Sequence, residues 1–128
     1  MGYRSDVVLA MSAPIKPYFL TLMAMNPKAK KFIEGADVLA SSKIEEGDFV
    51  VAWSGVKWYA SYDEVEAIIN FVFDLENHDL SDYGAKHGDI QWEEELFKFI
   101  RIGEEHGDVD VVGTGFWDLM PVTKIDWP

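Results

Sequence analysis

The centre of the chain contains two runs of apolar and aromatic residues, interrupted by a polar dipeptide, that predict two short strands. The runs Phe49–Trp53 and Val56–Ala60 flank Ser54-Gly55, a dipeptide that suits a two-residue turn of type I′ or II′. In that register Val51 lies opposite Trp58, and one face is almost wholly apolar because successive side chains alternate between faces. The pattern predicts a tight hairpin that turns one face toward a core.

Helical periodicity is strongest directly after this stretch. Four apolar residues recur at the i, i+3, i+4, i+7 spacing of one helix face, namely Val65, Ile68, Ile69 and Val72. Ser61 and Glu64 occupy the two positions of a capping box, in which each side chain bonds the other residue's backbone amide. We therefore expect an amphipathic helix over about Tyr62–Glu76.

The first third of the chain predicts a strand followed by two helical segments. Tyr3–Met11 alternates and is rich in Val and Leu, as in a strand. Ile15–Met25 has helical spacing, and Ser12 is placed to cap it. The dipeptide Asn26-Pro27 can then cap and start a second segment, Lys28–Glu34.

The last third predicts one long strand and an extension. Asn77–Asp89 is polar, contains two glycines and is typical of a loop. Gln91–Ile102 is apolar on both faces at its centre, which indicates an interior strand. Val109–Val112 and Phe116–Ile125 can each add an edge strand after it.

Together these elements predict an α+β fold in which residues 1–128 form a single domain. Their order favours the ferredoxin-like βαββαβ arrangement, an antiparallel sheet with two helices on one face, here with a C-terminal β extension. Right-handed crossovers would place the first and fourth strands side by side. The side chains expected in the core are Val51, Trp53, Trp58, Val65, Ile69, Phe97 and Phe99.

Composition narrows the class of protein without naming an activity. Hydrophobic residues make up 48% of the chain and aromatic residues 14%, as in globular proteins. The absence of cysteine removes disulfides, thiolate catalysis and cysteine-ligated metals. The sequence shows neither a signal-peptide layout nor an apolar run of membrane-spanning length, so we expect a soluble, cytoplasmic protein.

Charge is the most unusual feature of the sequence. The formal net charge is −12, yet residues 1–62 carry 6 acidic and 7 basic side chains while residues 63–118 carry 16 and 3. Such an acidic half repels nucleic acids and membrane surfaces and steers basic partners toward it. Solubility is the alternative explanation for the same charge.

Three short segments resemble small acidic proteins of tailed bacteriophages and prophages. They are Gly2–Val7, the stretch Val56–Tyr59 with Ser61–Val65 after it, and Phe99–Glu104. Together they cover less than a quarter of the chain, and their order and spacing agree with the expected strands and helix. The resemblance implies a phage origin, a bacterial host cell and a related fold, and it carries no catalytic residues across.

The sequence predicts no catalytic, metal or cofactor site. His78, His87 and His106 lie in two loops at irregular spacing, whereas a metal site needs three or four converging ligands. The run Glu93–Glu95 offers like-charge repulsion without an acid and base division of labour. Gly113–Gly115 lacks the lysine and helix start of a phosphate loop, and we expect a turn there.

We therefore expect an interaction protein rather than an enzyme. Its acidic face would bind a basic surface of a host protein, in the sharper form by imitating nucleic acid to block a nuclease, polymerase or defence complex. The alternatives are a small-molecule binder or enzyme with a nucleotide-like ligand between sheet and loops, and a structural homodimer. The candidate contacts are Asp63, Glu66, Asp74, Glu76, Asp79, Asp82, Glu93, Glu94, Glu95, Glu104, Glu105, Asp108 and Asp110.

Overall fold

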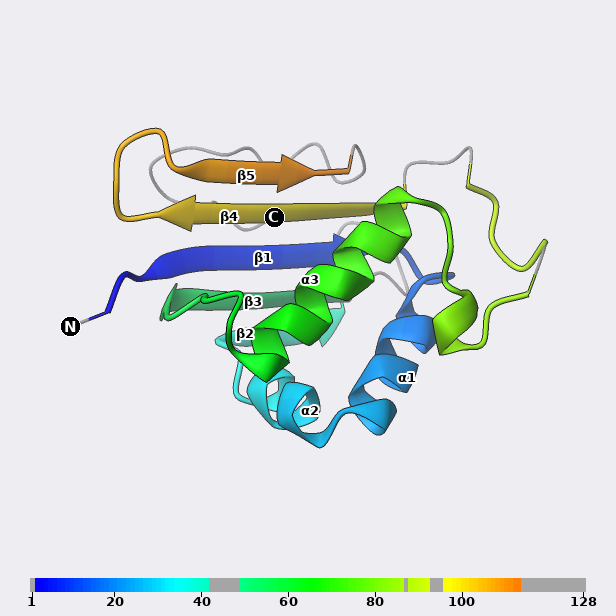
Figure 1. Cartoon of the computed structure of the whole chain (residues 1–128). Coiled ribbons are helices and arrows are strands. Elements are labelled where there is room, and N and C mark those ends of the chain that lie inside the picture. The colour runs from blue at the N-terminus through cyan, green and yellow to red at the C-terminus, as the bar shows by residue number, and fades with distance from the viewer. Residues whose placement is uncertain (1, 42–48, 87, 93–95, 114–128) are drawn as a thin grey trace.

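An antiparallel sheet forms the centre of the computed structural model, which describes residues 2–41, 49–86, 88–92 and 96–113. The five strands of this described part are β1 (Ser5–Met11), β2 (Val38–Ser41), β3 (Phe49–Val56), β4 (Phe97–Gly103) and β5 (Val109–Val112). They lie in the order β2-β3-β1-β4-β5 (Figure 1). The helices are α1 (Lys16–Met25), α2 (Pro27–Glu34), α3 (Asp63–Glu76) and the short 3-10 helix η1 (Ser81–Tyr83).

β1 is the central strand because its residues are apolar on both faces. Leu9 pairs with Val51 of β3 on one side and with Phe99 of β4 on the other. The prediction that the first strand and the strand around Phe99 lie side by side is confirmed. Both faces of β1 are buried, since Val7 to Met11 are inaccessible to solvent.

The helices α1, α2 and α3 cover one face of the sheet (Figure 1). Their buried side chains, such as Phe19, Ile33 and Ile68, join Leu9 and Val51 in one core. The other face of the sheet is buried as well and carries Val8, Ala10, Val50, Ala52, Ile100 and Ile102. The α+β class with an antiparallel sheet is thus confirmed, and three α-helices replace the two expected in the described part of the chain.

The predicted hairpin around Ser54-Gly55 is wrong. β3 runs through this dipeptide as one strand and pairs with β1, so that Ser5 lies opposite Val56 and Val7 opposite Trp53. β3 therefore has one more residue than β1 in this interval, which is a β-bulge. Gly55 lies in this bulge and has φ of +61°, a conformation that glycine adopts without strain.

The strand that pairs with β3 in the expected hairpin position is β2, not Val56–Ala60. Leu39 of β2 lies opposite Val51, the place that the hairpin gave to Trp58. Trp58 is nevertheless buried, in the connection between β3 and α3. The expected core is confirmed for Val51, Trp53, Val65, Phe97 and Phe99, which are buried, whereas Ile69 is only half-buried.

Helix ends agree with the sequence only in part. The Asn26 side chain accepts the Ala29 amide at 3.1 Å and caps α2, as expected. The predicted capping box of α3 is wrong, because the N-cap residue is Tyr62 and its side chain makes no capping bond. Ser12 likewise does not cap α1, whose N-cap residue is Ile15.

The described part of the second half differs from the prediction in two places. Within the described residues of the strand expected over Gln91–Ile102, β4 begins only at Phe97, and η1 interrupts the expected loop. Glu93–Glu95 and the possible edge strand Phe116–Ile125 lie outside the described residues. Within the described residues, none of the helices combines the length and the apolar character needed to cross a membrane.

Candidate functional site

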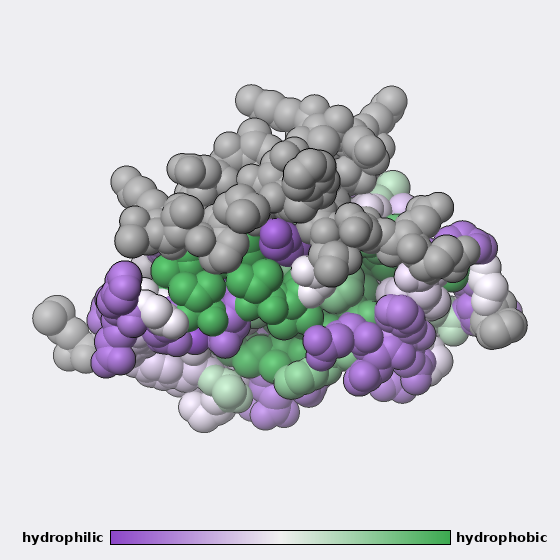
Figure 2. All heavy atoms as spheres, turned by 90° about the horizontal axis from the view of Figure 1, so that it is seen from above, coloured by the Kyte–Doolittle hydropathy of each residue, from purple (hydrophilic) through white to green (hydrophobic). Residues whose placement is uncertain are grey.

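An apolar groove runs between α3 and the strands β4 and β5. Its volume is about 490 Å³, and its described lining residues are Trp58, Ile69, Val72, Phe73, Phe99, Val109, Asp110, Val111 and Val112. Trp58 and Phe99 are buried and form its base, whereas Phe73, Val109 and Val111 are 55%, 38% and 44% exposed. Figure 2 shows this apolar surface as a continuous patch.

Both walls of the groove contain apolar side chains that are not buried in the core. α3 buries Val65, Ile68 and Val72 against the sheet, and Phe73 is one position further around the helix. β5 is the outer strand next to β4, so Val109 and Val111 have no further strand beside them among the described residues. Exposed apolar patches of this kind are typical of binding surfaces.

Acidic side chains gather at the two ends of this groove. The turn between β4 and β5 carries the exposed Glu104 and Glu105, and the exposed Glu76 lies at the C-terminal end of α3, one turn after Phe73. Figure 1 places the β4–β5 turn and the C-terminal end of α3 at opposite ends of the sheet. In Figure 2 hydrophilic residues accordingly lie on both sides of the apolar patch.

The described members of the expected acidic set belong to several different elements. Asp63 and Glu66 are at the start of α3, where Asp63 Oδ2 lies 2.8 Å from Lys28 Nζ. That hydrogen bond lowers the pKa of Asp63 and raises the pKa of Lys28. Glu93, Glu94 and Glu95 lie outside the described residues.

Asp74 and Asp79, two of the acidic candidates, accept hydrogen bonds that stabilise the fold near the C-terminal end of α3. Asp74 is partly buried and accepts a hydrogen bond from the Tyr83 hydroxyl at 3.2 Å, and desolvation raises the pKa of its carboxyl. Asp79 accepts the Ser81 hydroxyl at 2.6 Å and the Ser81 amide at 3.0 Å. These bonds lower the pKa of Asp79 and hold the start of η1.

Asp108 and Asp110 both form ion pairs with Arg101 of β4. The guanidinium donates to Asp108 at 2.6 and 3.2 Å and to Asp110 at 2.7 Å. The Tyr3 hydroxyl donates to Asp108 at 2.6 Å. Arg101 first and Tyr3 second lower the pKa of Asp108 to about 2, and the pKa of Arg101 rises in return. This network fastens β5 and the N-terminal segment to β4.

The three segments that carry the phage resemblance meet at this end of the sheet. The Tyr3 amide donates to the Tyr59 hydroxyl at 2.6 Å, and the Tyr3 hydroxyl accepts the Glu105 amide at 2.8 Å. A Cβ at Gly103 would overlap the Asp108 carboxylate and the Tyr3 hydroxyl, so only glycine permits this approach. Sequence reasoning missed the network because its members are up to 105 residues apart.

The described histidines are on the surface. His78 is exposed, has φ of +58° and stacks on Trp92 with ring centroids 4.8 Å apart, while His106 is exposed in the β4–β5 turn. His87, Thr114 and Gly115 lie outside the described residues. Among the residues that are described, no group of three or more His, Asp or Glu side chains could hold a metal ion.

Comparison with known proteins yields no match to any family model, curated protein or solved structure.

Proposed function

We propose that this chain is a phage-type interaction protein that binds a basic, amphipathic segment of a host protein in the groove between α3 and β5. The observation that carries the proposal is an exposed apolar groove with carboxylates at both of its ends. A segment with apolar side chains flanked by lysine or arginine matches that pattern, and a helix in a groove is a common way to present it.

The apolar part of the surface would supply most of the affinity. Phe73, Val109 and Val111 are accessible without any rearrangement, and Trp58 and Phe99 lie beneath them as a firm base. Binding energy concentrates in such central apolar contacts, which a surrounding rim shields from water. Covering these exposed side chains would remove apolar surface from water, which favours binding.

The carboxylates would supply orientation and association rate. Glu104 and Glu105 at one end and Glu76 at the other are exposed, and none of them forms an ion pair with another described residue. Unpaired surface charges of one sign attract a partner of opposite charge over a Debye length. A mimic of nucleic acid would need an uninterrupted row of carboxylates, so the separated groups favour an amphipathic basic partner.

A ferredoxin-like architecture is part of the proposal. The order β2-β3-β1-β4, with antiparallel neighbours throughout, supports it, and β5 then represents the C-terminal extension. In this reading β5 widens the sheet beyond the four-stranded fold and forms one wall of the groove beside α3. The extension is thus the element that creates the binding surface.

The test uses a labelled helical peptide of leucine and lysine with its leucines on one face, together with a copy that has glutamate for lysine. Fluorescence anisotropy at low salt should show binding of the lysine peptide and none of the glutamate peptide. The double substitution Phe73→Ser and Val111→Ser should weaken binding about tenfold, because it removes two apolar contacts. About 0.5 M salt should weaken binding by screening the carboxylates.

Leu20→Ser is the matched control, since Leu20 is an equally exposed apolar residue on α1 and does not line the groove. It should leave the affinity unchanged. Equal affinities for all variants would mean that the acidic charge binds the peptide without the groove, and the proposal would fail. Sedimentation of the free protein completes the test, because a dimer that Val111→Ser dissociates would make a second copy the occupant instead.

A further inference from the structure

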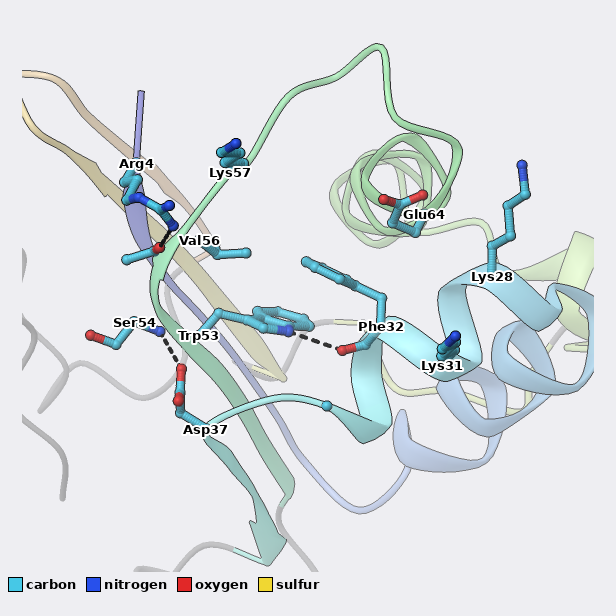
Figure 3. A pocket seen from close by; sticks show the side chains of 12 residues that line it. Arg4, Lys28, Lys31, Phe32, Asp37, Trp53, Ser54, Val56, Lys57 and Glu64 are labelled. Atoms are coloured by element: carbon cyan, nitrogen blue, oxygen red, sulfur yellow. Dashed lines mark hydrogen bonds between the residues drawn. The ribbon is translucent and has the colours of Figure 1, made fainter. Parts of the chain in front are cut away.

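A second cavity lies at the β3 bulge, away from the groove. It is bounded by β3, by α2 with the turn after it, and by the start of α3, and its volume is about 570 Å³ (Figure 3). Small-molecule sites usually have volumes of about 300–1,000 Å³. The strands β1 and β4 separate β3 from β5, so this cavity is distinct from the surface proposed to bind a protein partner.

An aromatic pair forms the apolar side of the cavity. The rings of Phe32 and Trp53 stack with centroids 4.8 Å apart and planes 16° from parallel. The Trp53 indole donates to the Phe32 carbonyl at 3.1 Å, which fixes α2 against β3. Figure 3 shows both rings beside the cavity with Val56 next to them. A planar apolar group could therefore lie against a wall that is already in place.

Hydrogen bonds hold the backbone of the bulge beside this pair. The Ser54 amide donates to Asp37 at 2.6 Å, and the Gly55 amide donates to Asp6 at 2.8 Å. Arg4 donates to the Gly55 carbonyl at 2.8 Å, so its guanidinium lies at the edge of the cavity.

The charge of the lining is opposite to that of the molecule. Four of the 11 basic side chains of the chain line this cavity, against two of its 23 acidic ones, Asp37 and Glu64. The basic residues are Arg4, Lys28, Lys31 and Lys57. Lys28 is bound to Asp63, whereas neither Lys31 nor Lys57 forms an ion pair with another described residue. Both lysines are exposed and able to bind an anion.

We propose that this cavity binds a small phosphorylated molecule with a planar ring, of the size of a nucleotide. Lys31, Lys57 and Arg4 would contact the phosphates through charge-assisted hydrogen bonds, and the ring would lie against the wall formed by Phe32 and Trp53. The overall charge of −12 would repel long nucleic acids, while a compact ligand experiences mainly the local basic charge.

The experiment titrates the full chain with ADP, with tripolyphosphate and with adenosine, by calorimetry at about 0.15 M salt, where distant charges are screened. ADP should bind, and tripolyphosphate and adenosine should each bind at least about tenfold more weakly, because each offers only one of the two contacts. Equal binding of ADP and tripolyphosphate would overturn the ring contact. Absence of ADP binding at millimolar concentration would overturn the proposal.

Two sets of variants locate the site. The double substitution Lys31→Gln and Lys57→Gln should weaken ADP binding about tenfold or more, since it removes two cationic contacts. Lys30→Gln is the matched control, because Lys30 is the exposed neighbour of Lys31 on α2 and does not line the cavity. Equal affinity of the double variant and Lys30→Gln would place the ligand elsewhere. Melting curves of all variants confirm that each remains folded.

Discussion

Asp108 bonds to a guanidinium and a phenol at the same time, and this pairing determines its response to acid. Arg101 and Tyr3 hold the pKa of its carboxyl at about 2, below the ordinary value of about 3.9 for aspartate. A pKa that is lower in the folded state means that the ionised form favours folding. This contribution is therefore complete above about pH 4 and is lost as the pH falls through about 2.

Replacing Asp108 by Asn should make the stability less sensitive to acid between about pH 4 and pH 2, because the titrating group is gone. Urea unfolding at a series of pH values measures the slope, which does not depend on the neutral-pH stability of the variant. Asp74→Asn is the control of opposite sign, since desolvation raises the pKa of Asp74 and its protonation favours the folded state. Above about pH 4, where the folded protein takes up this proton first, that variant should lose stability more steeply than the native chain as the pH falls. Slopes equal to those of the native chain in both windows would contradict the assignment.

At the scale of elements, a cluster of aromatic rings joins α2 and the sheet. Trp58 lies 5.4 Å from Trp53 and 6.0 Å from both Phe32 and Phe99, measured between ring centroids. Only 9% of Trp58 is exposed, although it belongs to the connection that leads from β3 into α3. The cluster therefore packs α2 against β3 and fixes the connection that leads into α3.

Trp58→Ala should lower the free energy of unfolding by about 3–5 kcal/mol, as truncation of a large buried aromatic side chain does. Phe73→Ala is the matched control, because Phe73 is 55% exposed on the same groove, and its loss should cost less than about 1 kcal/mol. Denaturant titration gives both values. Similar small losses for the two variants would show that the cluster does not stabilise the fold.

On the scale of the whole molecule, the two sides of α3 differ in the sign of their charge. The β3 side has a basic cavity, and the β5 side has carboxylates at both ends of an apolar groove. Within the described residues, ion pairs join only Lys28 to Asp63 and Arg101 to Asp108 and Asp110. Most of the 23 acidic side chains of the chain have no basic residue left to pair with, so repulsion among them opposes folding.

Raising sodium chloride from about 0.01 M to about 0.5 M should therefore increase the melting temperature, because the Debye length falls from about 30 Å to a few Å. Scanning calorimetry or circular dichroism measures the shift. The double substitution Glu104→Gln and Glu105→Gln should leave the protein as stable as before or more so, and should reduce the response to salt. A melting temperature that is constant or falls with salt would contradict the repulsion.

Much of the fold was predictable where residues close in sequence decide the outcome. The spacing of Val65, Ile68 and Val72 is enough to specify α3, and Asn26-Pro27 is enough to specify the start of α2. The apolar character of β1 identifies a strand whatever its neighbours are. The excess of acid in the second half also follows from the sequence, because counting needs no coordinates.

Tertiary structure decided the features in which distant partners compete with a local preference. Ser54-Gly55 has the composition of a turn, but six residue pairs between β3 and β1 outweigh one turn and convert it into a bulge. The same competition places Leu39 opposite Val51. Pairing of β1 with β4 also brought Tyr3 to Asp108. Neither the groove nor the basic cavity has a signature in sequence, because each joins residues whose proximity exists only once the sheet has formed.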